Sequence, residues 1–148
     1  MNHSRPSLAL VLAMALLALA GCSDGPTGIS AATIAQHRAA WLSHGLNRYG
    51  FDYQFTGFLI NGVGDHFHVV VIGDTARSVT DINTGLLAIP GDFPSINHLF
   101  DEAEAARRNG GLTAIEFDPV LAFPTRITLA GPPDASGSRY ATNITPLP

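Results

Sequence analysis

An uninterrupted apolar run of thirteen residues, from Leu8 to Ala20, constrains the fold most, because it marks the part of the chain that cannot belong to the folded domain. The run follows a short polar segment with a positive charge at Arg5, which is the order of an export signal. A membrane-spanning helix needs about 20 apolar residues, so this run is too short for a permanent span. The sequence therefore predicts a secretory signal peptide over residues 1–21.

The run ends in Leu19-Ala20-Gly21-Cys22, which resembles the lipobox of bacterial lipoproteins: an aliphatic residue and two small residues before a cysteine. In that class the cysteine sulfur receives a diacylglycerol, and cleavage leaves the cysteine as the first residue. The resemblance implies that Cys22 is the lipid-attachment site and carries a diacylglycerol and an acyl chain. We expect no cofactor besides these groups. Each buried methylene contributes about 0.8 kcal/mol, so these chains make a stable anchor.

The lipobox resemblance also implies a location in the cell envelope, lipid-anchored. Ser23, rather than an aspartate, follows the cysteine, which favours the outer membrane facing the periplasm in a Gram-negative bacterium. In other bacteria the expected place is the outer face of the cell membrane. The alternative is a plain cleaved signal with a cysteine at this position by chance.

The cysteine and lysine content excludes several chemistries. Cys22 is the only cysteine, so once acylated it leaves no thiol for a disulfide, a zinc site or nucleophilic catalysis. All eight basic residues are arginines, which excludes a lysine Schiff base and a P-loop lysine. The net charge is −4, and Arg107-Arg108 is the one basic pair. This balance argues against a nucleic-acid partner.

The residues after the signal divide into a tether and one domain. Residues 22–29 are small and polar, which is typical of a flexible tether. Residues 30–148 have a length that suits a single domain, and short turns between consecutive strands imply antiparallel pairing. We expect an α+β domain. Its antiparallel sheet has about five to six strands, with an N-terminal helix and a long helix between strands 3 and 4 packed on one face.

Turn signals and hydrophobic spacing predict the individual elements. Residues 30–44 are rich in helix formers, with Ser30 as the N-cap. Ser95 is the predicted N-cap of the second helix, whose apolar residues recur at i, i+3, i+4 and i+7 up to Ala103. Asn61-Gly62 predicts a tight hairpin turn. Strands are predicted over residues 51–60, 66–72, 77–82, 112–117, 124–129 and 139–144.

Several short motifs, in the order of these elements, carry a family resemblance. They are Trp41, Phe51-Asp-Tyr-Gln-Phe55, Val69-Val-Val-Ile-Gly-Asp74, Ser95-Ile-Asn-His-Leu-Phe-Asp101, Ile115-Glu-Phe-Asp-Pro119 and Ala122-Phe-Pro-Thr-Arg-Ile127. With these motifs the chain resembles the domain of unknown function 6174 family, uncharacterised bacterial proteins of which many are lipoproteins. Many members carry a close cysteine pair where this chain has Gly57-Phe58-Leu59, so no redox or metal role carries over. The resemblance implies the fold and the location, and no reaction.

His66 and His68 are the leading metal-ligand candidates. Two residues apart in a strand, they point to the same face, and Asp52 or Gln54 of the neighbouring strand is a possible further ligand. The alternative is that Phe67 and the following valines fill the core, while the histidines occupy the solvated face. A zinc site needs at least three protein ligands, and the spacing identifies no third one.

Two acidic patterns have simpler explanations than metal binding or catalysis. Asp81 begins a stretch that resembles a calcium loop, with Asp92 at its twelfth position, but a proline and apolar residues fill the middle. A turn at Asn83-Thr-Gly85 explains this stretch better. Glu116 and Asp118 lie two residues apart, and an aspartate before proline is typical of a turn. No serine lies in a recognisable nucleophile motif, so the sequence indicates no catalytic residue.

The sequence therefore favours a non-enzymatic binding or structural module of the cell envelope. The membrane, reached through the lipid anchor, and an envelope protein are the expected partners. Binding is expected through the exposed sheet face or through the proline-rich loop from Ile89 to Pro94, with Phe93 as an exposed anchor. The alternative is a metal-binding protein or metal-dependent enzyme that uses His66 and His68.

Overall fold

The computed structural model describes residues 28–57, 66–131 and 136–148. The elements along the chain are α1 (Ala31–Ser43), β1 (Arg48–Gly57), β2 (His66–Ile72), β3 (Thr75–Asp81), the short 3₁₀ helix η2 (Pro90–Asp92), α2 (Ile96–Arg108), β4 (Leu112–Phe117), β5 (Pro124–Leu129) and β6 (Gly137–Pro146). The expected export signal, Cys22, most of the tether and the Asn61-Gly62 turn lie outside the described residues.

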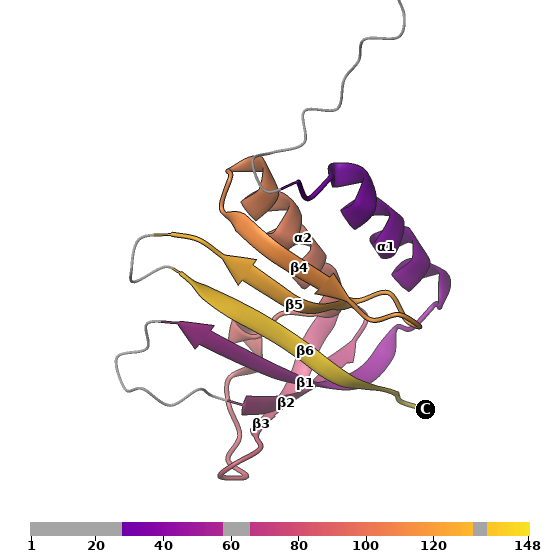
Figure 1. Cartoon of the computed structure of the whole chain (residues 1–148). Coiled ribbons are helices and arrows are strands. Elements are labelled where there is room, and N and C mark those ends of the chain that lie inside the picture. The colour runs from indigo at the N-terminus through magenta and orange to yellow at the C-terminus, as the bar shows by residue number, and fades with distance from the viewer. Residues whose placement is uncertain (1–27, 58–65, 132–135) are drawn as a thin grey trace, which may run out of the picture.

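The strands form one six-stranded antiparallel sheet with the order β3-β2-β1-β6-β5-β4. Each half of the sheet comes from one helix followed by three strands, and pairing between β1 and β6 joins the halves. Both helices lie on the same side of the sheet, and the opposite face is uncovered (Figure 1). The predicted α+β fold, with the long helix between the third and fourth strands, is confirmed.

The core fills the space between the helices and the inner face of the sheet. Alternation along β2 buries Phe67, Val69 and Val71, as a half-covered strand requires. The predicted apolar stripe of α2 is fully buried, and α1 contributes Ile34 and Trp41. The core and the side chains packed on it come from residues 29–144, so a soluble form of the chain that starts at Ser23 retains all of them.

The helix starts follow their predicted caps. The Ser30 hydroxyl accepts a hydrogen bond from the Thr33 amide at 3.0 Å, and α1 is followed by Gly45 at φ 65°. The central strands begin earlier or run longer than predicted: β1 starts at Arg48, and β6 spans Gly137–Pro146. Both strands pair on two sides, which extends regular structure beyond the alternating segments. Among the described residues, no helix is long and apolar enough to cross a membrane.

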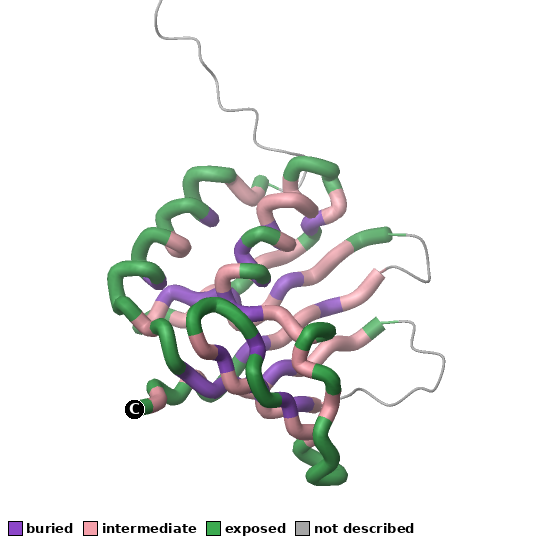
Figure 2. Tube along the Cα trace, turned by 180° about the vertical axis from the view of Figure 1, so that it is seen from behind, coloured by how far each residue is buried: buried purple, intermediate pink, exposed green. Residues whose placement is uncertain are grey.

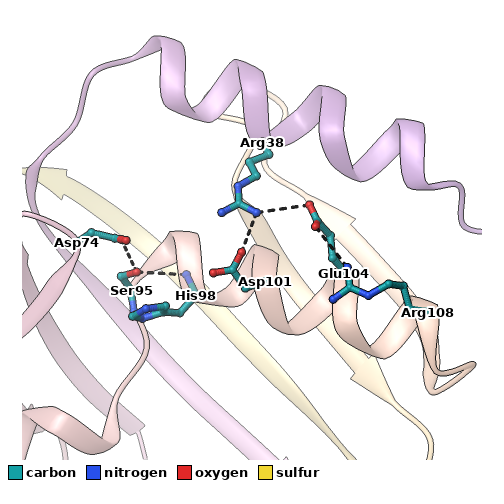
Figure 3. A network of polar contacts seen from close by, with 7 residues as sticks. All are labelled: Arg38, Asp74, Ser95, His98, Asp101, Glu104 and Arg108. Carbon is teal, nitrogen blue, oxygen red and sulfur yellow. Dashed lines mark hydrogen bonds and ion pairs between the residues drawn. The ribbon is translucent and has the colours of Figure 1, made fainter.

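Ion pairs connect the two helices on their solvent-exposed side (Figure 3). The guanidinium of Arg38 in α1 lies 2.7 Å from a carboxylate oxygen of Asp101 and 3.4 Å from one of Glu104 in α2. Glu104 also pairs at 3.9 Å with Arg108, four residues later, which is a stabilising spacing on a helix. Such partly exposed pairs contribute little each, and they mainly fix how α1 lies against α2.

A second polar cluster holds the start of α2 against the β2–β3 turn (Figure 3). Ser95 is fully buried, and its hydroxyl accepts a hydrogen bond from the His98 amide at 3.2 Å. The same hydroxyl donates to the Asp74 carboxylate at 2.5 Å. Gly73 and Asp74 have φ of 58° and 63°, which the tight two-residue turn requires. The loop between β3 and α2 is therefore fixed at its exit.

Candidate functional site

The two candidate histidines lie on the uncovered face of the sheet. Along β2 the buried residues alternate with His66 and His68, which are half-exposed and point away from the helices. His68 lies opposite Asp52 of β1, and His66 lies opposite Gln54. Both histidines share one face, as their spacing predicts. Their partial exposure agrees with the alternative interpretation, in which the histidines occupy the solvated face of the sheet.

His68, Asp52 and Asn143 form a hydrogen-bonded group across three strands. Nδ1 of His68 lies 2.8 Å from Oδ1 of Asp52, and the Asn143 side-chain amide donates to Oδ2 of Asp52 at 2.8 Å. Burial raises the pKa of Asp52, but the hydrogen bonds from Asn143 and His68 outweigh this and hold the pKa below its usual value. The imidazole lies over Gly50, where an added Cβ would be 2.9 Å from Nε2 of His68.

The metal-site interpretation lacks a ligand set. No group of three or more His, Cys, Asp or Glu side chains in the described part of the chain is placed to hold a metal ion. Both oxygens of Asp52 already accept hydrogen bonds, and the residue opposite His66 is an amide rather than a carboxylate. The expected third ligand is therefore not provided by the neighbouring strand.

The other acidic side chains make structural contacts. Oδ1 of Asp81 accepts hydrogen bonds from the backbone amides of residues 83 and 84, so this segment forms an ordinary turn. Asp118 accepts from the amides of residues 120 and 121 in the same way. Glu116 pairs with Arg126 of β5 at 3.2 Å on the uncovered face.

A groove with a volume of about 510 Å³ opens on the inner side of the sheet. Residues of three strands form one side, and the segment that leads into α2 forms the other. We call it the aromatic groove, and its lining consists of Tyr53, Phe55, Phe67, Ala88, Ile89, Asp92, Phe93 and Arg139. The volume falls within the range of about 300 to 1,000 Å³ that is usual for ligand sites.

Phe93 is a wall of this groove rather than a freely exposed anchor. Its ring meets Phe67 edge to face at 4.6 Å between centroids and Tyr53 at 6.2 Å, and the residue is half-buried. The expectation of an exposed side chain is corrected in this respect, because the loop folds back over the sheet. The predicted loop nevertheless contributes Ile89, Asp92 and Phe93 to the groove.

The charges of the groove are balanced. Asp92 and Arg139 carry one charge each, and the guanidinium of Arg139 lies 6.0 Å from the centroid of the Phe55 ring. Arg139 also lies 3.5 Å from a carboxylate oxygen of Glu102 in α2. Burial raises the pKa of Tyr53 to about 12, so its hydroxyl stays protonated at neutral pH. The groove is thus an apolar site with a few polar groups.

A loop rich in exposed aliphatic side chains borders the groove. Ile82 is 44% exposed, Leu86 69%, Leu87 81% and Ile89 71%. We call residues 82–89 the aliphatic loop. It projects from one end of the domain, away from the start of α1 (Figure 1), and it is exposed when seen from behind (Figure 2).

Sequence reasoning found one side of this site and missed the other. Phe93 and its loop were singled out, whereas Tyr53, Phe55 and Arg139 come from β1 and β6, far away in the sequence. The available signal was the apolar segment from Leu86 to Ile89, which is unusual between two turns.

Comparison with known proteins identifies the chain at the level of its family. No curated protein and no solved structure matches it significantly. The family of unknown function DUF6174 matches residues 33–146, which include nearly all of the described domain. The match covers most of the chain and agrees with the resemblance seen in its motifs. The chain therefore belongs to the DUF6174 family.

Proposed function

We propose that this chain is a non-enzymatic binding module of the cell envelope, anchored through lipid on Cys22, that binds an apolar segment of an envelope protein. The binding site is the aromatic groove together with the aliphatic loop. The observation that carries the proposal is the combination of four exposed aliphatic side chains with an aromatic cavity beside them. Exposed apolar side chains that gather beside a cavity are typical of interaction sites.

The energetics favour a partner that covers both parts of the site. Burying one exposed aliphatic side chain completely contributes about 1.5 to 3 kcal/mol, so Leu86, Leu87 and Ile89 together provide a substantial driving force. The balanced pair of Asp92 and Arg139 supplies polar groups at the edge of this apolar surface. A central apolar cluster with polar groups around it is the usual anatomy of a protein interface.

Charge and position favour a protein segment over a lipid surface. Binding to anionic lipid needs clustered basic residues, and the groove has one arginine, which is balanced by Asp92. The aliphatic loop also lies at the end of the domain opposite the start of α1 (Figure 1). A chain held by its N-terminus would present this loop away from the anchoring membrane.

The test uses the soluble chain from Ser23 onward and the fluorescent probe 8-anilinonaphthalene-1-sulfonate, an aromatic anion. We expect the probe to bind in the groove and Ile89→Asp to weaken its binding by about tenfold or more, since a charge enters the apolar wall. Val120→Asp is the matched control, because Val120 is 76% exposed but lies beyond β4, at the other edge of the sheet. Equal probe binding by the two variants would rule out the groove as the site.

A second experiment tests the partner class in the envelope of cells that express the full chain. A photo-crosslinking residue at position 87 is expected to give a discrete protein adduct that Phe93→Ala reduces. The same residue at position 120 is the control. Adducts of equal yield at both positions, or adducts only with lipid, would contradict a protein partner at this surface.

A further inference from the structure

We propose that the partner segment binds as an extended strand, adding to the sheet at its β3 edge through the backbone of Leu87. This inference rests on the proposed function and specifies the conformation of the ligand. It concerns a short stretch, Leu86 to Ala88, that already lies along β3. The antiparallel bridge between Thr80 and Leu87 defines this arrangement.

Two backbone hydrogen bonds hold the stretch on β3. The Asp81 amide donates to the Leu86 carbonyl at 2.9 Å, and the Ala88 amide donates to the Val79 carbonyl at 3.0 Å. In antiparallel pairing, the residue between two such bonded neighbours directs its own N–H and C=O to the opposite side. The N–H and C=O of Leu87 therefore point outward, away from the sheet.

The outward groups are accessible for pairing. Leu87 is 81% exposed, and among the residues that the structure describes no backbone hydrogen bond to its N–H or C=O is found. Ile89, two residues later, is also extended, with φ −74° and ψ 113°, so its N–H points to the same side. Its carbonyl accepts from the Asp92 amide, and Pro90 ends the row. The free edge therefore offers three groups: N–H and C=O of Leu87 and N–H of Ile89.

The other edge of the sheet, β4, has an irregular register. β4 pairs with β5 through a register that shifts at two places, between Leu112 and Ala114 and between Glu116 and Phe117. Irregularities of this kind are a common way to protect an edge strand from further pairing. The β2–β3 pairing shifts once, between Val70 and Val71, away from Thr80. Beside Thr80 the extended backbone is flanked by exposed aliphatic side chains, which favours addition of a strand there.

The side chains of such a partner alternate between two surroundings. Thr80 lies opposite His68 on the uncovered face, so Leu87, opposite Thr80, directs its side chain to that face. A partner residue paired with Leu87 points the same way, and its two neighbours point to the inner side, where Ala88 lines the aromatic groove. The partner is therefore an extended polypeptide with apolar residues at alternate positions.

The decisive measurement is amide hydrogen exchange in the soluble chain from Ser23, followed by NMR with and without a probe peptide. The probe is acetyl-Thr-Val-Thr-Val-Thr-Val-amide, and a fully N-methylated peptide of the same sequence is the control. We expect the Leu87 and Ile89 amides to exchange about tenfold more slowly with the probe and at an unchanged rate with the control. An unchanged Leu87 rate at the solubility limit of the probe would overturn the proposal.

Two variants at one position separate backbone from side chain. Leu87→Pro removes the outward N–H but neither bond to β3, so we expect about tenfold weaker binding of the probe peptide. Leu87→Ala retains the N–H, and we expect about threefold weaker binding or less. Equal loss in both variants would assign binding to the side chain and contradict strand addition. If Leu87→Pro disturbs the fold, the exchange rates of the unsubstituted chain decide.

The outcomes also separate this inference from the proposed function. Binding of the naphthalene probe that depends on Ile89, without slower exchange at Leu87, would leave the groove in place and reject the added strand. Slower exchange at Leu87, together with a groove that binds no naphthalene probe, would support the added strand and reject the groove as a binding site. Slow exchange that appears with rising protein concentration, without peptide, would make a second copy of the chain the occupant and overturn the assignment to a different protein.

Discussion

Replacement of Ser95 by alanine tests how the loop that carries the proposed site is held. The Ser95 hydroxyl caps α2 through the His98 amide at 3.2 Å and donates to Asp74 at 2.5 Å. Loss of an N-cap costs about 1 kcal/mol. Loss of the bond to Asp74 costs about another 1 kcal/mol, since Asp74 is exposed and its carboxylate regains water. We expect Ser95→Ala to lower the free energy of unfolding by about 2 kcal/mol.

The assay is urea unfolding followed by fluorescence of Trp41, the only tryptophan, which is buried in the core. The expected change is a lower midpoint at an unchanged slope, and a melting temperature lower by about 8 °C for a domain of this size. Asp74→Gly is the partner variant, because glycine adopts the positive φ of this position without strain. It should cost about 1 kcal/mol.

The double variant Ser95→Ala/Asp74→Gly distinguishes a shared contact from two independent effects. If the hydrogen bond couples the two residues, the double variant costs about 1 kcal/mol less than the sum of the single variants. Strictly additive costs would refute the coupling. A cost of Ser95→Ala below about 0.5 kcal/mol would refute the role of the cap itself.

Three further predictions concern the sheet. Gly137→Ala places a Cβ against the carbonyl of Thr56, which belongs to the backbone and cannot rotate away as a side chain could. We expect the free energy of unfolding, measured in urea, to fall by about 3 kcal/mol or more. Burial raises the pKa of Tyr53 from 10.0 to about 12 in the folded state, so stability should fall as pH rises from about 10 to about 12. Tyr53→Phe should remove about 2 to 3 kcal/mol of that loss, measured by unfolding at both pH values. Gly50→Ala should displace the His68 ring from Asp52 at a cost of about 1 kcal/mol, visible as a changed His68 imidazole NMR signal; an unchanged signal would contradict the close approach.

Most of the fold was predictable because local chemistry and tertiary packing agree. The apolar stripe of α2 from Ile96 to Ala103 and the alternation of β2 both match the faces that the structure buries. Ser30 and Ser95 were identified as caps because a hydroxyl before an apolar-periodic segment serves this purpose. The extent of β6 was not predictable, since its outer residues pair with β1 rather than follow an alternating pattern.

The candidate site was predictable only in part. Phe93 was found because it lies in a loop rich in proline, but its orientation depends on Phe67 and Tyr53, which come from other strands. Asp52 was expected near the histidines because neighbouring strands were expected to pair. Asn143 was not expected there, because it adopts φ 56° where the β1–β6 register shifts. A register shift of this kind forms only when the two strands pair, so the sequence of one strand does not reveal it.

The central position of β6 has a consequence for how the chain is made. The last strand of the chain pairs with the first one, Gly57 with Gly137 and Tyr49 with Pro146. The two halves of the sheet therefore cannot join until β6 has been synthesised. Because contacts so distant along the chain form slowly, we expect closure to be the slow step of folding. A chain of this topology therefore keeps two incomplete half-sheets, each with its own helix, until this late pairing forms.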